Sequence, residues 1–291
     1  MNPGILYALG AYLSWGLFPL YFRQIAAIPA LQIVAHRTLW SLAFVAIVLL
    51  ATGHLKWLRD VGAATWRRFA LSALLIAVNW LTYVWAVGHG HVLDASLGYF
   101  INPLVNVALG FAVLHERPRP AQWFAVGLAA FGVLWLTVAA GRLPWVALVL
   151  AVSFGFYGLM RKTAALGAIE GLTLETLILA PLAAVGLAFW WQAGDLAGQT
   201  PVDWAWLIGT GPVTAGSLLL FAAGARRIPL ATLGLVQYVS PSLQFLLGVF
   251  LFHEPMSASR LVAFAFIWGA LAVYSAEGLW QTRRALTVKP V

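Results

Sequence analysis

A run of eight residues in this chain recurs in altered form about 138 residues later. Residues 99–106 read YFINPLVN, and residues 237–244 read QYVSPSLQ. The shift places Pro103 on Pro241 and aligns three pairs of polar residues. These pairs are Tyr99 with Gln237, Asn102 with Ser240, and Asn106 with Gln244. A duplicated polar stripe beside a proline, in an apolar chain, is typical of membrane transporters built from two repeats.

The composition of the chain predicts a membrane protein. Hydrophobic residues make up 62% of the chain and charged residues 9%, whereas soluble domains carry roughly 25% charged residues. Ten apolar segments are each long enough to cross about 30 Å of hydrocarbon. They are predicted at 4–22, 30–52, 69–88, 93–114, 121–138, 143–160, 172–192, 204–223, 230–252 and 259–277. We therefore expect an all-α integral membrane protein with ten transmembrane helices.

The positions of Lys and Arg predict the orientation, because cytoplasmic loops carry an excess of both residues. Thirteen of them lie in the termini and in alternate connections, whereas the other connections hold only Arg23, Arg142 and Arg260. Both termini are therefore expected on the cytoplasmic side. The net charge of +8 is dispersed over these segments, so it indicates topology and not nucleic-acid binding.

The internal similarity extends over both halves of the chain. Residues 14–23 read SWGLFPLYFR and residues 153–162 read SFGFYGLMRK, at an offset of 139. Residues 1–140 would hold five helices and residues 141–291 the other five. Because five is odd, the second copy enters the membrane from the opposite face. This predicts two inverted repeats around a central cavity, an architecture that supports alternating access.

Polar and aromatic side chains inside the predicted spans are candidates for a solute site, because burying them in hydrocarbon costs free energy. The repeated polar residues share one face of each helix, and the following prolines can kink the helices. Aromatic walls with a few polar groups suit an amphipathic solute. Each residue alone fits helix-to-helix packing equally well, but the stripe as a whole favours a cavity. The candidates are Tyr12, Trp15, Arg37, Asn79, Trp80, Tyr83, Tyr99, Asn102, Asn106, Phe154, Tyr157, Ser217, Gln237, Ser240 and Gln244.

Four of the charged residues within the spans or near their ends carry specific expectations. Arg37 is expected to snorkel to the outer surface, to pair with Asp94, or to bind a carboxylate of the solute. Glu175 is expected to be a solvated residue near the cytoplasmic surface, with proton coupling as the alternative. Glu116 and Glu254 end two spans and are either interfacial charges or parts of gates.

No sequence motif indicates a metal, a nucleotide or another cofactor. The chain has no Cys, its six His residues show no metal-binding spacing, and no glycine-rich phosphate loop precedes a Lys-Ser/Thr pair. No catalytic pair stands out within the spans, so we do not expect an enzyme. The expected partners are a small-molecule substrate and the lipid bilayer, without nucleic acid. The oligomeric state stays open, with a homodimer among the alternatives.

Several segments resemble a known family. They are SWGLFPLYF at 14–22, AHR at 35–37, ASLGYFINPL at 95–104 and FHEP at 252–255. They are similar to RarD-type members of the EamA group, within the drug/metabolite transporter superfamily, and the resemblance covers essentially the whole chain. It implies ten helices in two inverted five-helix repeats and a permease of the bacterial inner membrane that exports small metabolites. Similar proteins are labelled as chloramphenicol-related permeases or as exporters of amino acids, including aromatic ones.

The sequence therefore predicts a secondary transporter that works by alternating access. Its expected solutes are small amphipathic metabolites, first of all amino acids with aromatic or other apolar side chains. A chloramphenicol-like drug permease or a sugar permease would share the same scaffold. A membrane scaffold that transports nothing, or an intramembrane enzyme, is the further alternative, and it predicts a centre filled by side chains instead of a continuous cavity.

Overall fold

The structure is a computed structural model that describes residues 2–115, 117–196, 198–225, 227–228 and 236–287. These residues form helices and connections without a strand. The helices are α1 (Pro3–Arg23), α2 (Ala30–Thr52), α3 (Ala63–Gly88), α4 (Val92–Leu114), α5 (Pro120–Ala140), α6 (Trp145–Lys162), α7 (Ala168–Ala193), α8 (Pro201–Ala225), α10 (Val239–Leu246) and α11 (Ala258–Thr287). The short 3-10 helix η1 (Lys56–Asp60) follows α2, and the π-helix η2 (Leu247–Leu251) continues α10.

Eight of the described helices are long and apolar enough to cross a membrane. Two shorter apolar helices, Trp145–Arg161 and Val239–Leu251, accompany them. The predicted all-α membrane fold is therefore confirmed. The span predicted at 230–252 is described only from residue 236 onwards. Apolar side chains face outward from the bundle, as at Leu182 and Phe250, which is what a lipid surrounding requires.

One of the two stripe prolines interrupts its helix. The chain is helical at residues 236–237, turns at Tyr238, and resumes as α10. Pro241 has no N–H to donate to the carbonyl of Gln237, four residues earlier. The disruption expected from proline therefore occurs here. At Pro103, by contrast, α4 continues without a break.

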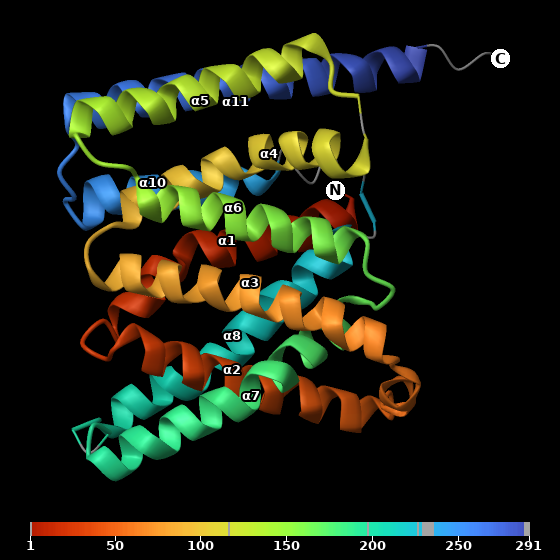
Figure 1. Cartoon of the computed structure of the whole chain (residues 1–291), viewed down its shortest axis with the longest axis vertical. Coiled ribbons are helices and arrows are strands. Elements are labelled where there is room, and N and C mark those ends of the chain that lie inside the picture. The colour runs from red at the N-terminus through yellow and green to blue at the C-terminus, as the bar shows by residue number, and fades with distance from the viewer. Residues whose placement is uncertain (1, 116, 197, 226, 229–235, 288–291) are drawn as a thin grey trace.

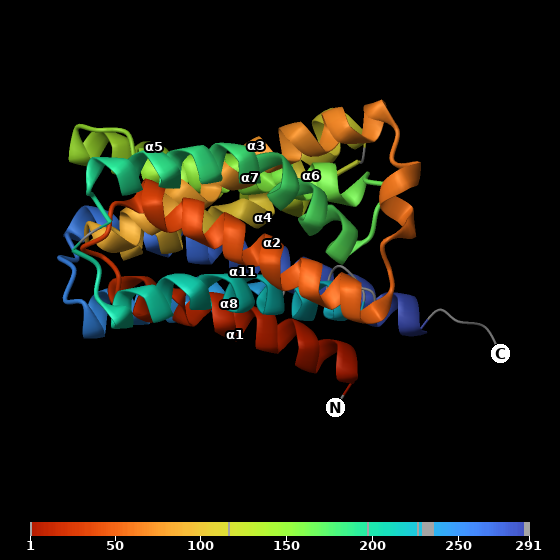
Figure 2. The ribbon, with the colours of Figure 1, turned by 90° about the horizontal axis from the view of Figure 1, so that it is seen from below.

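The helices run side by side and form one bundle (Figures 1 and 2). At one edge of Figure 1, α5 packs against α11, and at the other edge α7 and α8 pack against α2. Between them lie α1, α3, α4, α6 and α10. The beginning of α1 and the end of α11 lie at the same end of the bundle. This is the arrangement that an even number of membrane crossings produces.

The contacts between helices are symmetric between the two halves of the chain. The contact of α1 with α8 has its counterpart in the contact of α3 with α6, and that of α1 with α10 in that of α4 with α6. The contact of α2 with α8 corresponds to that of α3 with α7. The pairs α2 with α7, α4 with α10, and α5 with α11 each join two corresponding helices. Exchanging the halves therefore maps these contacts onto one another, as a pseudo-twofold axis requires.

Small residues allow the helices from the two halves to approach closely. A side chain carbon added at Gly98 of α4 would lie 2.7 Å from the carbonyl oxygen of Ala147 in α6. At Gly211 of α8 it would overlap the backbone of Trp40 in α2. Membrane helices associate largely through close packing of this kind. These glycines thus fix how the polar residues of neighbouring helices meet.

Glu254 caps the first turn of α4. One carboxylate oxygen accepts a hydrogen bond from the backbone N–H of Val92 at 2.6 Å, and the other from that of Leu93 at 2.9 Å. Glu254 is only 7% exposed, so this residue at the end of its span is a buried helix cap, which neither of the two interpretations named. His253, just before it, takes a left-handed backbone conformation with φ of 51°. Glu116, the corresponding residue of the first half, lies outside the described residues.

Replacing Glu254 with Ala is expected to destabilise the fold. The substitution leaves two N–H groups of the first turn of α4 without their acceptor. Losing a helix cap costs about 1–2 kcal/mol, so the melting temperature in detergent should fall. The control is Asp60→Ala, in the exposed η1 segment. Equal melting of the two variants would contradict the capping role of Glu254.

Candidate functional site

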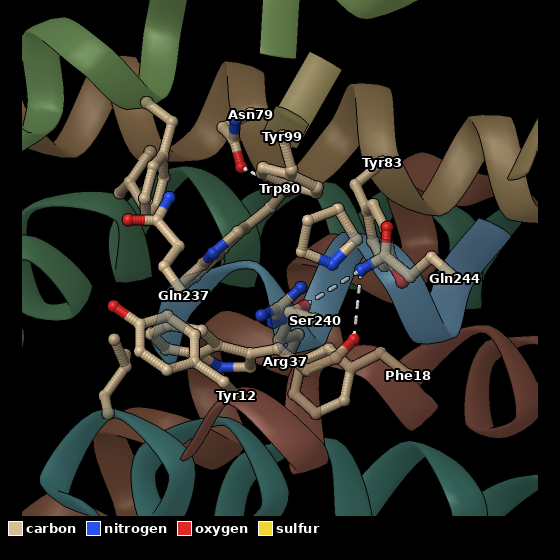
Figure 3. Close-up of a pocket in the computed structure, with 15 residues that line it drawn as sticks. Tyr12, Phe18, Arg37, Asn79, Trp80, Tyr83, Tyr99, Gln237, Ser240 and Gln244 are labelled. Carbon is tan, nitrogen blue, oxygen red and sulfur yellow. Dashed lines mark hydrogen bonds between the residues drawn. The ribbon is translucent and has the colours of Figure 1, made fainter. Parts of the chain in front are cut away.

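A cavity of about 70 Å³ lies between the two halves, beside the middle of α1 and α6 (Figure 3). Small-molecule sites are typically concave and mostly apolar, with a few polar groups. Side chains from both halves surround the cavity, and most of them are aromatic or aliphatic. The lining consists of Tyr12, Trp15, Phe18, Arg37, Ile76, Asn79, Trp80, Tyr83, Tyr99, Phe154, Leu218, Gln237, Ser240, Pro241 and Gln244.

Most of the predicted site residues line this cavity. Four predicted residues do not line it: Asn102, Asn106, Tyr157 and Ser217. Four others line it without having been predicted: Phe18, Ile76, Leu218 and Pro241. Phe18 lies three residues after Trp15, and Ile76 three residues before Asn79. Helical spacing therefore contained the signal that would have identified Phe18 and Ile76.

Arg37 is the charged side chain of the cavity. It is 4% exposed, and its guanidinium carbon lies 4.2 Å from the ring centroid of Trp80. Its Nε donates to Thr214 Oγ1 at 2.9 Å. No carboxylate in the described part of the chain pairs with it, and Asp94 pairs instead with Arg260 at 3.2 Å. The interpretations of snorkelling and of pairing with Asp94 are therefore wrong.

One group of polar lining residues is engaged in bonds between helices. The hydroxyl of Tyr99 in α4 donates to Asn79 Oδ1 in α3 at 3.1 Å. The amide nitrogen of Asn79 donates to the carbonyl of Leu150 at 3.2 Å and to Ser153 Oγ at 3.1 Å, both in α6. This network ties α3 and α4 to α6, so it shapes one wall of the cavity.

Two lining residues keep a polar atom free. The amide nitrogen of Gln244 donates to the carbonyl of Trp15 at 3.1 Å (Figure 3). Its Oε1, like the hydroxyl of Tyr83, has no hydrogen-bond partner among the described residues. Both side chains are buried, and buried polar atoms almost always have a partner. Both atoms are thus buried beside the cavity without a hydrogen-bond partner among the described residues.

Asn102 and Asn106 do not line the cavity, and Asn102 connects neighbouring helices. The amide nitrogen of Asn102 donates to the carbonyl of Ala151 in α6 at 3.1 Å. Its oxygen accepts from Asn106 at 3.3 Å and from Gln237 at 3.4 Å. For Asn102 the interhelical interpretation fits better than the cavity interpretation, whereas the bond from Asn106 stays within α4. Asn102 contacts the cavity lining through Gln237.

Ser217 and Tyr157 do not line the cavity either, but each bonds to another buried or lining residue. Ser217 Oγ accepts from the indole N–H of Trp15 at 2.8 Å and so orients that ring at the cavity wall. The hydroxyl of Tyr157 donates to Glu175 Oε2 at 3.3 Å. Glu175 itself is 1% exposed, so the expectation of a solvated residue is wrong.

Comparison with known proteins identifies the family. Residues 2–138 match the EamA-like transporter family. The chain is 50% identical to an uncharacterized transporter of Pseudomonas aeruginosa, over 98% of this chain and 97% of that one. It is 45% identical to Protein RarD of Escherichia coli K12, over 97% of each chain. The chain belongs to the EamA-like transporter family, among its RarD-type members. It is thus a multi-pass membrane transporter.

Two further similarities complete the comparison. The chain is 32% identical to a chloramphenicol-sensitive protein RarD of Pseudomonas aeruginosa, over 98% of this chain and 96% of that one. A solved crystal structure that is 21% identical superposes with a TM-score of 0.63 and covers 95% of this chain and 99% of the other. At that identity, the likeness shows that the fold is shared.

Two substitutions in the repeated stripe should separate a connecting role from a lining role in this EamA-family transporter. Asn102→Ala removes the bond to α6 and the oxygen that accepts from Asn106 and Gln237, and leaving such donors without a partner costs about 1–3 kcal/mol. Gln237→Ala changes the cavity wall, so we expect slower transport with near-normal melting in detergent. Melting curves and transport rates in proteoliposomes test the pair. Normal melting of Asn102→Ala together with a large loss in Gln237→Ala would reverse the assignment.

Proposed function

We propose that this transporter exports small amphipathic carboxylates, first of all amino acids with aromatic or other apolar side chains, across the bacterial inner membrane. The observation that carries the proposal is the Arg37 guanidinium, which is buried in an aromatic cavity without an ion-pair partner among the described residues. The expected mechanism is alternating access around this cavity.

A solute carboxylate would supply the ion-pair partner that Arg37 lacks among the described residues. A buried charge is costly unless it is paired and hydrogen-bonded. The Trp80 ring covers the guanidinium, and Thr214 accepts from Nε. Neither neutralises the charge. A guanidinium binds a carboxylate through two parallel hydrogen bonds, and this is the interaction that Arg37 lacks within the described part of the chain.

The rest of the cavity suits the other two parts of an amino acid. An ammonium group needs acceptors, and Gln244 Oε1 and the Tyr83 hydroxyl are both unused by described residues. Rings of Tyr12, Trp15 and Phe154 line the cavity and provide apolar contact for a side chain. Aromatic faces also attract cations. The lining thus favours a solute with a carboxylate, an ammonium group and an apolar side chain.

A neutral aromatic drug is the second candidate. The predominantly aromatic lining fits a compound such as chloramphenicol, and one relative is named as a chloramphenicol-sensitive protein. Such a compound lacks a carboxylate and would leave Arg37 unpaired. The two candidates therefore differ in their dependence on Arg37.

The two halves are proposed as inverted repeats, at residues 1–140 and 141–291, with both termini in the cytoplasm. The family match over residues 2–138 coincides with the first half. The helix contacts are symmetric between the halves, and the outermost helices begin and end at the same end of the bundle. The concentration of Lys and Arg in the connections at that end supports the cytoplasmic orientation.

Arg37→Met should abolish the preference for carboxylates. In proteoliposomes, we expect the wild type to exchange L-phenylalanine but not phenethylamine, which lacks the carboxylate. Losing one partner of a buried charge pair costs several kcal/mol, so kcat/KM for L-phenylalanine should fall about 100-fold or more. Chloramphenicol transport, if the wild type shows it, should change little.

The matched control for this substitution is Arg23→Met, because Arg23 is exposed and lies over Phe252, outside the cavity. This variant should transport L-phenylalanine like the wild type. Normal L-phenylalanine transport by Arg37→Met would refute the carboxylate assignment. Transport of chloramphenicol alone by the wild type would favour the drug permease, and no transport above protein-free liposomes would refute both.

A further inference from the structure

A second buried charge occupies the position in α7 that Arg37 occupies in α2. Each residue lies seven positions after the first residue of its helix, Ala30 for Arg37 and Ala168 for Glu175. The two are 138 residues apart, which is the spacing of the repeated stripe. At 1.5 Å per residue, each charge lies about 10 Å along its helix. Because α2 and α7 begin at opposite ends of the bundle, the cation and the carboxylate approach the centre from opposite faces.

Glu175 receives hydrogen bonds from both halves of the chain. One carboxylate oxygen accepts from Ser72 Oγ in α3, and the other from the Tyr157 hydroxyl in α6 at 3.3 Å. Arg161 Nη1 lies 3.8 Å from the carboxylate, which is an ion pair without a hydrogen bond. Ser72 belongs to the first half, and the other three residues belong to the second. The state of this carboxylate therefore acts on the contact between the halves.

The position of Arg161 is fixed by groups other than Glu175. Its Nη2 donates to the carbonyl of Gly167 at 3.0 Å, and its guanidinium carbon lies 5.5 Å from the ring centroid of Phe69. A side chain carbon at Gly171 would overlap the guanidinium, so a glycine there leaves the space that Arg161 occupies. Arg161 thus stabilises an ionised Glu175 electrostatically and stays in place when that charge is removed.

No other charged side chain of the helices around α7 faces Glu175 within the described residues. On α3, Arg67 and Arg68 are exposed. Beyond the end of α2, His54 pairs with Glu170, which lies more than one turn nearer the start of α7. Asp203 lies in the first turn of α8, and α8 begins at the end of the bundle opposite to the start of α7. The titration of Glu175 therefore depends on Ser72, Tyr157 and Arg161.

A chain of rings connects this carboxylate to the solute cavity. The ring of Tyr157, whose hydroxyl donates to Glu175, lies 5.8 Å from that of Phe154. Phe154 lines the cavity and lies 5.9 Å from Tyr99, another lining residue. Glu175 is thus close enough to respond to the cavity but does not line it. Intramembrane carboxylates in such positions serve as proton carriers in many transporters.

We propose that Glu175 is the proton site of the transporter, and that one proton enters the cell for each solute molecule exported. The proposal rests on the transport function proposed above. In the outward-facing state, the carboxylate accepts one proton from the outside and forms one O–H bond. In the inward-facing state, that bond breaks and the same proton leaves into the cytoplasm. Protonation removes the attraction to Arg161 and weakens the bonds to α3 and α6, which biases the two packings of the halves.

Proteoliposomes test the coupling with L-phenylalanine as the probe. Vesicles that are one pH unit more acidic inside, with the membrane potential clamped at zero, should let protons leave and accumulate L-phenylalanine up to about tenfold. Glu175→Gln should show no accumulation while still exchanging labelled for unlabelled L-phenylalanine. The control is Glu170→Gln, which should accumulate L-phenylalanine like the wild type.

The outcomes separate this proposal from the transport function. Exchange of L-phenylalanine by the wild type without accumulation, or accumulation on the alkaline side, overturns proton exchange but leaves transport standing. Accumulation by Glu175→Gln equal to that of the wild type overturns the assignment to Glu175. Absence of any L-phenylalanine exchange by the wild type contradicts the proposed solute instead.

Proton binding can also be measured without any transported solute. In infrared difference spectra of the full-length protein, a protonated-carboxyl band should appear as the pH is lowered from about 9 to about 5. Glu175→Gln should lack this band. If that variant does not fold, Tyr157→Phe should shift the frequency of the band, because the carboxyl loses one hydrogen-bond partner. A wild type without the band, or a band unchanged in both variants, would show that Glu175 is only a structural connection.

Discussion

Burial of the Arg37 guanidinium constrains the centre of this protein, because an unpaired charge in a low-dielectric surrounding has to be stabilised by what lies next to it. Trp80 of α3 covers one face and Thr214 of α8 binds Nε. These contacts draw helices of both halves around one side chain. They leave the charge without a counterion among the described residues, and this is why we propose a solute with an anionic group.

The second repeat carries a buried charge of opposite sign at the position equivalent to that of Arg37. Arg37 and Glu175 lie at equivalent positions of α2 and α7, and these helices begin at opposite ends of the bundle. In the account proposed here, the cation binds the solute and the carboxylate binds the proton. Both residues contact helices of the other half. Binding at either one therefore changes the contact between the halves, which is the element that alternating access has to move.

The sequence predicted the helices and most of the cavity lining because both follow from local pattern. Apolar length defines a membrane span, and helical spacing places residues on one face. The local pattern does not show which neighbouring helix each helix face contacts. Asn102 shares the face of Tyr99, yet it bonds to Ala151 in α6, where the close contact at Gly98 brings the two helices together. The relative rotation of helices is set by such distant contacts and not by the spacing itself.

The sequence also did not predict how deeply two carboxylates are buried or which groups bond to them. The sequence indicated a solvated residue at Glu175, and an interfacial charge or part of a gate at Glu254, because each lies near the end of a span. The structure buries both, since hydroxyls of α3 and α6 reach the first and backbone N–H groups of α4 reach the second. These partners are more than 15 residues away in the chain. No local pattern contains them.

The central claim is that the cavity beside Arg37 binds the solute and opens to both sides of the membrane. The chain has no cysteine, so Leu218→Cys introduces a single thiol into the cavity wall. A membrane-impermeant maleimide, applied to oriented vesicles from either face, should label this thiol from both sides, and L-phenylalanine should slow the labelling from each. Labelling from one side alone, or labelling that L-phenylalanine does not slow, would contradict the claim.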